Sequence, residues 1–151
     1  MALGLAWVAL AAGCGGGGDA DRTAADTSQL ARAERSLQSE LEAAVEHLGT
    51  PAQEGIRVAP TRCDDRARNE VTSGYRLRLK MSAGETEKLL RRAERFWRER
   101  GRHVRVVGAK GTFPAVFATA DPGWTFSLQL FPERGEALLS GGTPCLPDPK
   151  A

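Results

Sequence analysis

Residues 124–131 read Trp-Thr-Phe-Ser-Leu-Gln-Leu-Phe, and they carry the clearest secondary-structure signal in this 151-residue chain. Large apolar residues occupy every second position, and the residues between them are mostly polar. Because successive side chains of a strand point to opposite faces, this alternation predicts a strand with one buried and one solvent-facing side. The predicted buried side chains are Trp124, Phe126, Leu128 and Leu130, and the other side carries Thr125, Ser127, Gln129 and Phe131.

Further strand signals lie on both sides of this stretch. Residues 71–81 alternate in the same way, with Arg76, Arg78 and Lys80 on the polar side. Shorter candidates are residues 103–107, 113–119 and 136–140, together with a short edge strand at Ile56 and Val58. Tight turns, such as Asp-Pro-Gly at residues 121–123, separate the later strands. Short connections between consecutive strands predict an antiparallel meander.

Two other segments have apolar residues at helical spacing. The first begins at an N-cap, Asp26 or Thr27, and ends at Gly49, while the second begins at a capping box formed by Ser82 and Glu85. Each segment has a single apolar stripe, so each helix is expected to cover a sheet with that stripe. The stripes are Leu30, Leu37, Leu41, Val45 and Leu48 in the first helix, and Leu89, Leu90, Ala93, Phe96 and Trp97 in the second.

These patterns predict one α+β domain over residues 27–148. We expect an antiparallel sheet of four to five strands with two helices packed on one face, which is a two-layer sandwich. The second helix is long enough for a crossover connection. The strands at 71–81 and 103–107 are therefore either parallel neighbours or separated by another strand.

The charge balance and the motif content weigh against several function classes. The 21 Lys and Arg residues nearly balance the 19 Asp and Glu residues, so charge gives no reason to expect nucleic-acid binding. No glycine loop joins a strand to a helix, and neither His47 nor His103 stands in a catalytic motif. Asp64 and Asp65, beside Cys63, lack the further oxygen ligands of a hard-metal loop. We therefore predict no catalytic residues, no metal and no cofactor.

The first thirteen residues are predicted to be a signal peptide. Residues 3–12 form an apolar run that is too short to span a bilayer as a helix. The run ends in Leu-Ala-Ala-Gly-Cys at residues 10–14, and glycines follow. No Lys or Arg precedes Arg22, so we expect the natural translation start to lie upstream of Met1. Residues 14–26 are small and polar, and we expect them to form a flexible tether.

The sequence at residues 10–14 resembles the lipobox of bacterial lipoproteins, in which the cysteine receives a diacylglyceryl group and becomes the first residue of the mature protein. With the glycine-rich tether and the triplets Thr61-Arg62-Cys63 and Thr143-Pro144-Cys145, the chain is similar to small actinobacterial, Streptomyces-like lipoproteins. This resemblance implies lipidation of Cys14 and a location at the outer face of the cell membrane. It implies no particular activity.

The cysteine count supports export. If Cys14 is lipidated, Cys63 and Cys145 remain as an even pair outside the reducing cytosol. We therefore expect a disulfide between them. It closes a loop of about 82 residues, for which the chain-entropy model gives about 4–5 kcal/mol of stabilisation.

Two surfaces are candidate binding sites. The first is a basic stripe on the second predicted helix, which could contact anionic lipid headgroups or wall polymers. The i,i+4 pairing of these basic residues with Glu87 and Glu94 favours instead an ordinary solvated helix. The second is the side of the sheet away from the helices, which either holds a ligand or partner or is merely solvated. Because the apolar sides of helix and strand meet, the two surfaces lie on opposite outer faces. The stripe consists of Lys88, Arg91, Arg95, Arg98 and Arg102, and the sheet side carries Arg76, Arg78, Lys80, Thr125, Ser127 and Gln129.

The sequence thus predicts a lipid-anchored extracytoplasmic domain that binds or interacts at the cell envelope and is not an enzyme. Its expected partners are the membrane, through the anchor, and an envelope protein, a lipid or a wall polymer. A secreted, non-lipidated domain that binds a small molecule or a protein is the alternative. An envelope enzyme of unknown activity is the third hypothesis.

Overall fold

The computed structural model describes the backbone of residues 18–64, 69–108 and 113–151, and side chains from residue 29 onward within these ranges. Four features of the sequence analysis lie outside the described residues. They are the signal peptide at 1–13, the lipidation site Cys14, the first part of the tether, and Asp65.

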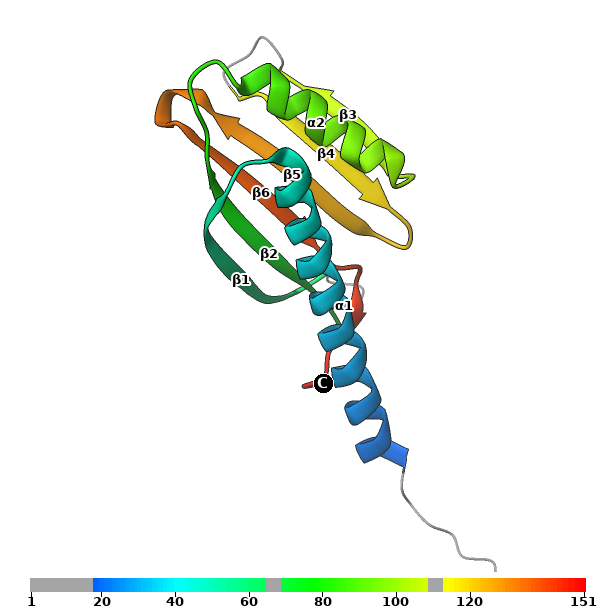
Figure 1. Ribbon diagram of the computed structural model, residues 1–151. Helices are drawn as coiled ribbons and strands as arrows, with labels where there is room; N and C mark the ends of the chain where they lie inside the picture. Colours follow the sequence, from blue (N-terminus) through cyan, green and yellow to red (C-terminus); the bar gives the residue numbers. More distant parts are fainter. Residues whose placement is uncertain (1–17, 65–68, 109–112) are drawn as a thin grey trace, which may run out of the picture.

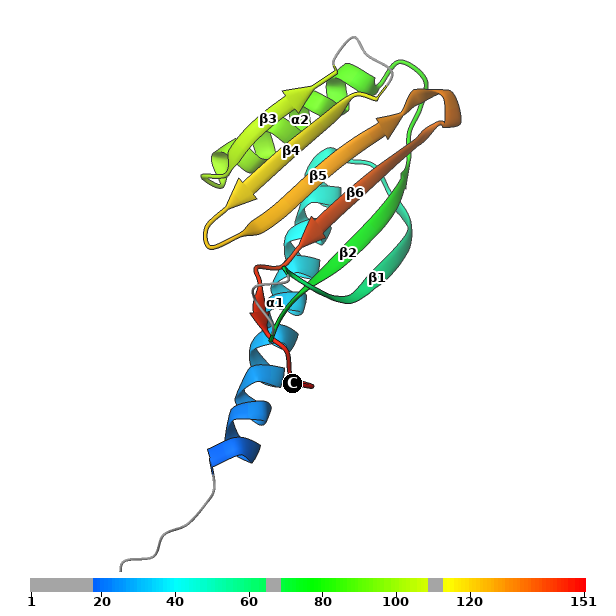
Figure 2. The same ribbon diagram turned by 180° about the vertical axis from the view of Figure 1, so that it is seen from behind.

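The described residues form two helices and a single antiparallel sheet. The helices are α1 (Gly18–Leu48) and α2 (Thr86–Glu99). The strands are β1 (Ala52–Arg62), β2 (Glu70–Lys80), β3 (His103–Val107), β4 (Ala115–Ala120), β5 (Trp124–Phe131), β6 (Glu136–Gly142) and β7 (Leu146–Pro147), with a 3-10 turn at Pro132–Arg134. The order across the sheet is β1-β2-β6-β5-β4-β3, and β7 pairs with β2. Both helices lie on the same face, and no described helix covers the other (Figure 1 and Figure 2).

The α+β class and the two-layer arrangement are therefore confirmed, but the expected strand number was wrong. The sheet has seven strands instead of four to five. Almost every residue of β1 is exposed, so an 11-residue strand leaves no alternating pattern in the sequence. β7 is only two residues long and contains Pro147. The strands β2 and β3 are not neighbours, because β6, β5 and β4 lie between them.

The core lies between the helices and the sheet. The side chains of Trp97, Leu128 and Leu139 have no solvent exposure. Helix α1 can approach β6 closely because Gly141 has no side chain, and a Cβ there would lie 2.5 Å from Cδ1 of Leu37. Both predicted apolar stripes thus face the sheet, and their burial supplies most of the folding free energy.

Helix α1 begins at Gly18, eight or nine residues before the N-cap expected at Asp26 or Thr27. The helix therefore runs through residues 18–26, which we assigned to the tether. Ala20, Ala24 and Ala25 have high helix propensity, and neither glycine nor proline interrupts residues 19–48.

The other helix ends follow capping rules with one difference. Gly49, at φ +67°, ends α1, and the Arg92 guanidinium donates to the carbonyl oxygen of Leu48 at 2.7 Å. The capping box expected at the start of α2 consists of two reciprocal hydrogen bonds. Only one of them forms, because Ser82 lies before the helix and Glu85 occupies the N-cap position. The backbone N–H of Ser82 donates to Oε2 of Glu85 at 3.2 Å. That hydrogen bond, followed by one from Lys88, lowers the pKa of the Glu85 carboxyl below its ordinary value.

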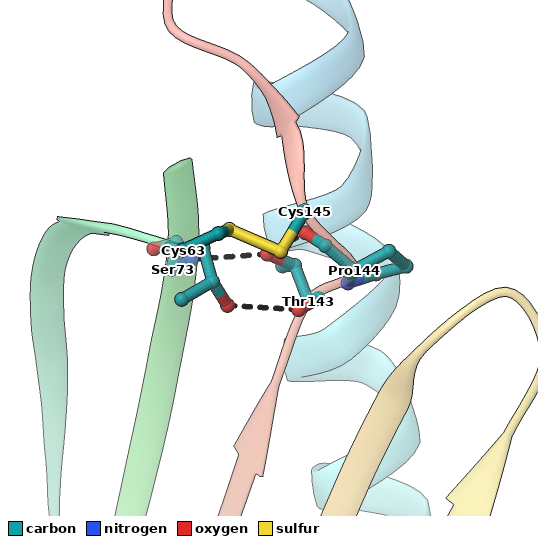
Figure 3. The surroundings of a disulfide bond; sticks show 6 residues. Cys63, Ser73, Thr143, Pro144 and Cys145 are labelled. Atoms are coloured by element: carbon teal, nitrogen blue, oxygen red, sulfur yellow. Dashed lines mark hydrogen bonds between the residues drawn. A yellow bond between two sulfur atoms is a disulfide. The ribbon is translucent and has the colours of Figure 1, made fainter. Parts of the chain in front are cut away.

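The predicted disulfide between Cys63 and Cys145 is confirmed (Figure 3). Their Cα atoms lie 6.0 Å apart, and the two residues are separated by 82 positions. Thr143, two positions before Cys145, is buried and makes two hydrogen bonds with the backbone of Ser73. The N–H of Thr143 donates to the carbonyl oxygen of Ser73 at 2.8 Å, and Oγ1 of Thr143 accepts from the N–H of Ser73 at 3.0 Å. The C-terminal segment is thus held against β2 by both the covalent bond and hydrogen bonds.

Replacing both Cys63 and Cys145 with serine should lower the free energy of unfolding by about 4–5 kcal/mol, because the reduced chain regains the entropy of a long open loop. Urea unfolding of the oxidised protein and of the double variant measures this difference. Reductant should shift the midpoint of the wild type but not that of the variant. Equal unfolding free energies would show that the disulfide contributes nothing.

Two neighbouring leucines of β6 test which face is buried. Leu139 has no exposure and packs under the helices, whereas Leu138 points to the other face and is half-buried. Leu139→Ala should cost about 2–5 kcal/mol of unfolding free energy by leaving a cavity. Leu138→Ala, the matched control, should cost clearly less. Equal losses in denaturant unfolding would contradict the one-sided core.

Candidate functional site

The uncovered face of the sheet consists of the strand side chains that point away from α1 and α2. The cross-strand register places Arg76 of β2, Ser140 of β6, Ser127 of β5 and Phe117 of β4 directly opposite one another in one row. A second row, next to the first, contains Gly74, Gly142 and Thr125. Side chains from strands far apart in the sequence therefore meet on this face.

These two rows surround an open hollow of about 350 Å³. Among the described residues its boundary includes one cation, several hydroxyl groups and two phenylalanines, and it includes no acidic residue. The residues at its boundary are Val58, Thr61, Thr72, Ser73, Gly74, Arg76, Phe117, Thr125, Phe126, Ser127, Ser140, Gly141 and Gly142. The hollow is at the small end of the volume range typical of small-molecule sites, about 300–1,000 Å³.

The hollow exists because two glycines of neighbouring strands stand opposite each other. Gly74 and Gly142 are register partners, so no side chain rises from either position. A Cβ on Gly142 would lie 2.8 Å from Oγ1 of Thr125, and a Cβ on Gly74 would lie 3.2 Å from Cβ of Val58. Any side chain at these two positions would fill the hollow and crowd its walls.

Three polar side chains of the hollow, Arg76, Ser127 and Ser140, have no side-chain partner within the described chain. Arg76 is exposed and makes no ion pair with a described residue. The hydroxyl groups of Ser127 and Ser140 make no side-chain hydrogen bond with described residues either. Thr72 differs, because its Oγ1 donates to the carbonyl oxygen of Thr143 at 2.8 Å. The unpartnered donors and acceptors converge where a ligand could satisfy them.

The residues predicted for the sheet face are only partly brought together. Arg76, Thr125 and Ser127 line the hollow, while Lys80 and Gln129 do not. Arg78 instead borders a smaller hollow of about 180 Å³ that also includes Arg134 and Glu136. Sequence reasoning missed Gly74, Gly142, Ser140, Phe117, Thr61 and Thr72. The isolated Gly74 within a strand was an available signal, because such glycines mark a bulge or a close approach.

The basic stripe on α2 is largely neutralised by acidic neighbours. The two predicted i,i+4 pairs form, Glu87 with Arg91 at 2.9 Å and Glu94 with Arg98 at 2.9 Å. Lys88 lies 3.3 Å from Glu85. Within the described chain Arg95 makes no ion pair. Exposed pairs of this kind contribute little to stability, and they leave little excess charge for an anionic partner.

Arg102 does not belong to this stripe. It follows the end of α2, and its side chain is only 26% exposed. Its guanidinium lies 3.4 Å from Glu40 of α1 and 5.4 Å from the ring centre of Phe126. Arg102 therefore joins the two helices to the sheet and does not form part of an outward-facing basic surface.

Neither a metal-ligand cluster nor a membrane-spanning helix occurs in the described part of the chain. No group of three or more His, Cys, Asp or Glu side chains is placed to hold a metal ion there. Neither described helix combines the length and the apolar character needed to cross a bilayer.

Comparison with known proteins gives no relative from which a function could be transferred. No family model matches the chain, and no curated protein sequence and no solved structure matches it.

Cation-exchange chromatography can show which basic surface carries accessible charge. A protein adsorbs through the face with excess positive charge, so neutralising unpaired cations should weaken adsorption more than neutralising paired ones. The triple variant Arg76→Gln, Arg78→Gln, Lys80→Gln should elute at lower salt than the triple variant Lys88→Gln, Arg91→Gln, Arg98→Gln. Both carry the same change in net charge. Earlier elution of the α2 variant would contradict the assignment.

Proposed function

We propose that this protein is a lipid-anchored binding module of the cell envelope, and that the uncovered face of its sheet is the ligand-binding surface. The observation that carries the proposal is the hollow around Gly74 and Gly142, where Arg76, Ser127 and Ser140 converge without partners in the described chain. A cationic group and free hydroxyls around a hollow are suited to binding. They supply no nucleophile–base pair of the kind that catalysis requires.

The extracytoplasmic location is supported by the disulfide. Disulfides persist in oxidising compartments and are rare in the cytosol. The pair Cys63–Cys145 leaves Cys14 as the one cysteine outside it, and Cys14 stands at the end of the leader. A diacylglyceryl group on Cys14 would supply two acyl chains, which suffice for stable membrane attachment where a single chain is marginal.

The course of α1 supports an anchor at this end of the chain. The helix starts at Gly18, four positions after Cys14, and Leu30 is the first of its described side chains to lie in the core. The 12 helical steps from Gly18 to Leu30 extend about 18 Å at 1.5 Å per residue. Figure 1 shows this part of α1 extending beyond the sheet. A helical spacer of this length would hold the uncovered face away from the bilayer and leave it accessible to an envelope ligand.

The first test is the fate of Cys14, because it separates the anchored module from the secreted alternative. In membrane fractions of the producing cell, intact mass should show a chain that begins at Cys14 with added diacylglyceryl mass. Reduction should add about two daltons for the single disulfide. The Cys14→Ser variant should lose both the added mass and the membrane association.

The double variant Cys63→Ser, Cys145→Ser is the matched control, and it should remain lipidated and membrane-bound. Wild-type protein that appears unmodified in the culture fluid would overturn the anchor and favour a secreted binding domain. Intracellular protein that retains Met1 and free thiols would overturn the envelope location as a whole.

A further inference from the structure

We infer that the hollow on the uncovered face binds an acidic sugar, meaning a single pyranose unit that carries a carboxylate. This inference rests on the proposed binding function and adds the chemical class of the ligand. Three properties of the hollow lead to it: its charge, its hydroxyl groups and its apolar walls.

The positive charge of the hollow favours an anionic ligand. Arg76 is the only ionisable side chain among the described residues of the hollow, and it is exposed and unpaired within the described chain. A guanidinium presents two parallel N–H groups that match the two oxygens of a carboxylate. A neutral ligand would gain nothing from this positive charge. Arg76 would repel a cationic ligand, and no acidic residue among the described boundary residues would attract one.

The hydroxyl groups of the hollow favour a ligand that carries hydroxyl groups in addition to its negative charge. Ser140 and Ser127 are register partners on adjacent strands, and Arg76 stands opposite Ser140 in the same row. Neighbouring strands lie about 4.8 Å apart, so the row from Arg76 to Ser127 covers about 10 Å. A hydroxyl both donates and accepts a hydrogen bond, and so do the hydroxyl groups of a sugar. A ligand with its carboxylate at Arg76 would place ring hydroxyls over Ser140 and Ser127.

The walls of the hollow fit the apolar side of a sugar ring. Phe117 continues the row beyond Ser127, and Val58 stands at the other side, in the row of Gly74. A pyranose has C–H groups on its faces that can contact such side chains. Because Gly74 and Gly142 have no side chains, the ring could approach the strand backbone. The volume of about 350 Å³ suits one sugar unit and not a long segment of polymer.

The experiment uses the full chain carrying Cys14→Ser, so that the protein is studied without a lipid. Glucuronic acid is the probe, and glucose and inorganic phosphate are its two matched controls, one lacking the carboxylate and one lacking the ring. Calorimetry measures affinity, and backbone amide shifts locate the site. Glucuronic acid should bind most tightly and should shift the amides of Gly74, Ser127, Ser140 and Gly142.

Two variants should weaken binding and one should not. Arg76→Gln should lower the affinity for glucuronic acid about tenfold, the effect of losing a charge-assisted hydrogen bond. Ser140→Leu should abolish binding by filling the hollow. Arg78→Gln, on the same strand and face but outside the hollow, should leave the affinity unchanged. Unchanged amide shifts elsewhere would show that each variant is folded.

Several outcomes would overturn the inference. Equal losses in Arg76→Gln and Arg78→Gln would show diffuse attraction to a basic face. Phosphate binding as tight as that of glucuronic acid would show an anion site without sugar selectivity. If none of the three probes binds, the hollow is not a site for acidic sugars. Failure of the proposed lipid anchor and envelope location would appear separately, in the intact mass and the fractionation of the wild type.

Discussion

The apolar contact of two helices with one side of a single sheet is the constraint on which the rest of this structure depends. Trp97 from α2 and Leu37 and Leu41 from α1 pack against Leu128 and Leu139, and all five are at most 1% exposed. Burial of this kind is non-directional, but here it takes place on only one side of each strand. No described helix therefore covers the opposite side, and its side chains are available for binding.

The two outer surfaces use their charges differently. On α2, helical spacing brings glutamates within reach of the basic residues, as in the pair of Glu87 and Arg91, and these charges offset one another locally. On the sheet, Arg76, Arg78 and Lys80 occupy alternate positions of β2, and none of them has an ion-pair partner among the described residues. The uncovered face thus combines free positive charge with the hollow created by its glycines.

The disulfide secures one edge of the sheet. Cys63 follows the edge strand β1, and Cys145 precedes β7, so the bond joins an exposed strand to the C-terminal segment. Edge strands are the part of a sheet most open to fraying and to pairing with other chains. A covalent bond at this position limits such opening, and Thr143 reinforces it through hydrogen bonds with Ser73.

The sequence by itself determined the features that depend on local spacing: the strand at residues 124–131, the helix stripes and the ion pairs of α2. These were predictable because side-chain direction repeats every two or 3.6 residues along the chain. The pairing of Cys63 with Cys145 followed instead from the cysteine count. Only the tertiary structure decided the strand order, and with it the position of β6 between β2 and β5. Ser140 and Gly142 therefore could not be recognised beforehand as neighbours of Arg76. Strand register depends on contacts between distant segments, and exposed strands such as β1 leave no periodic signal.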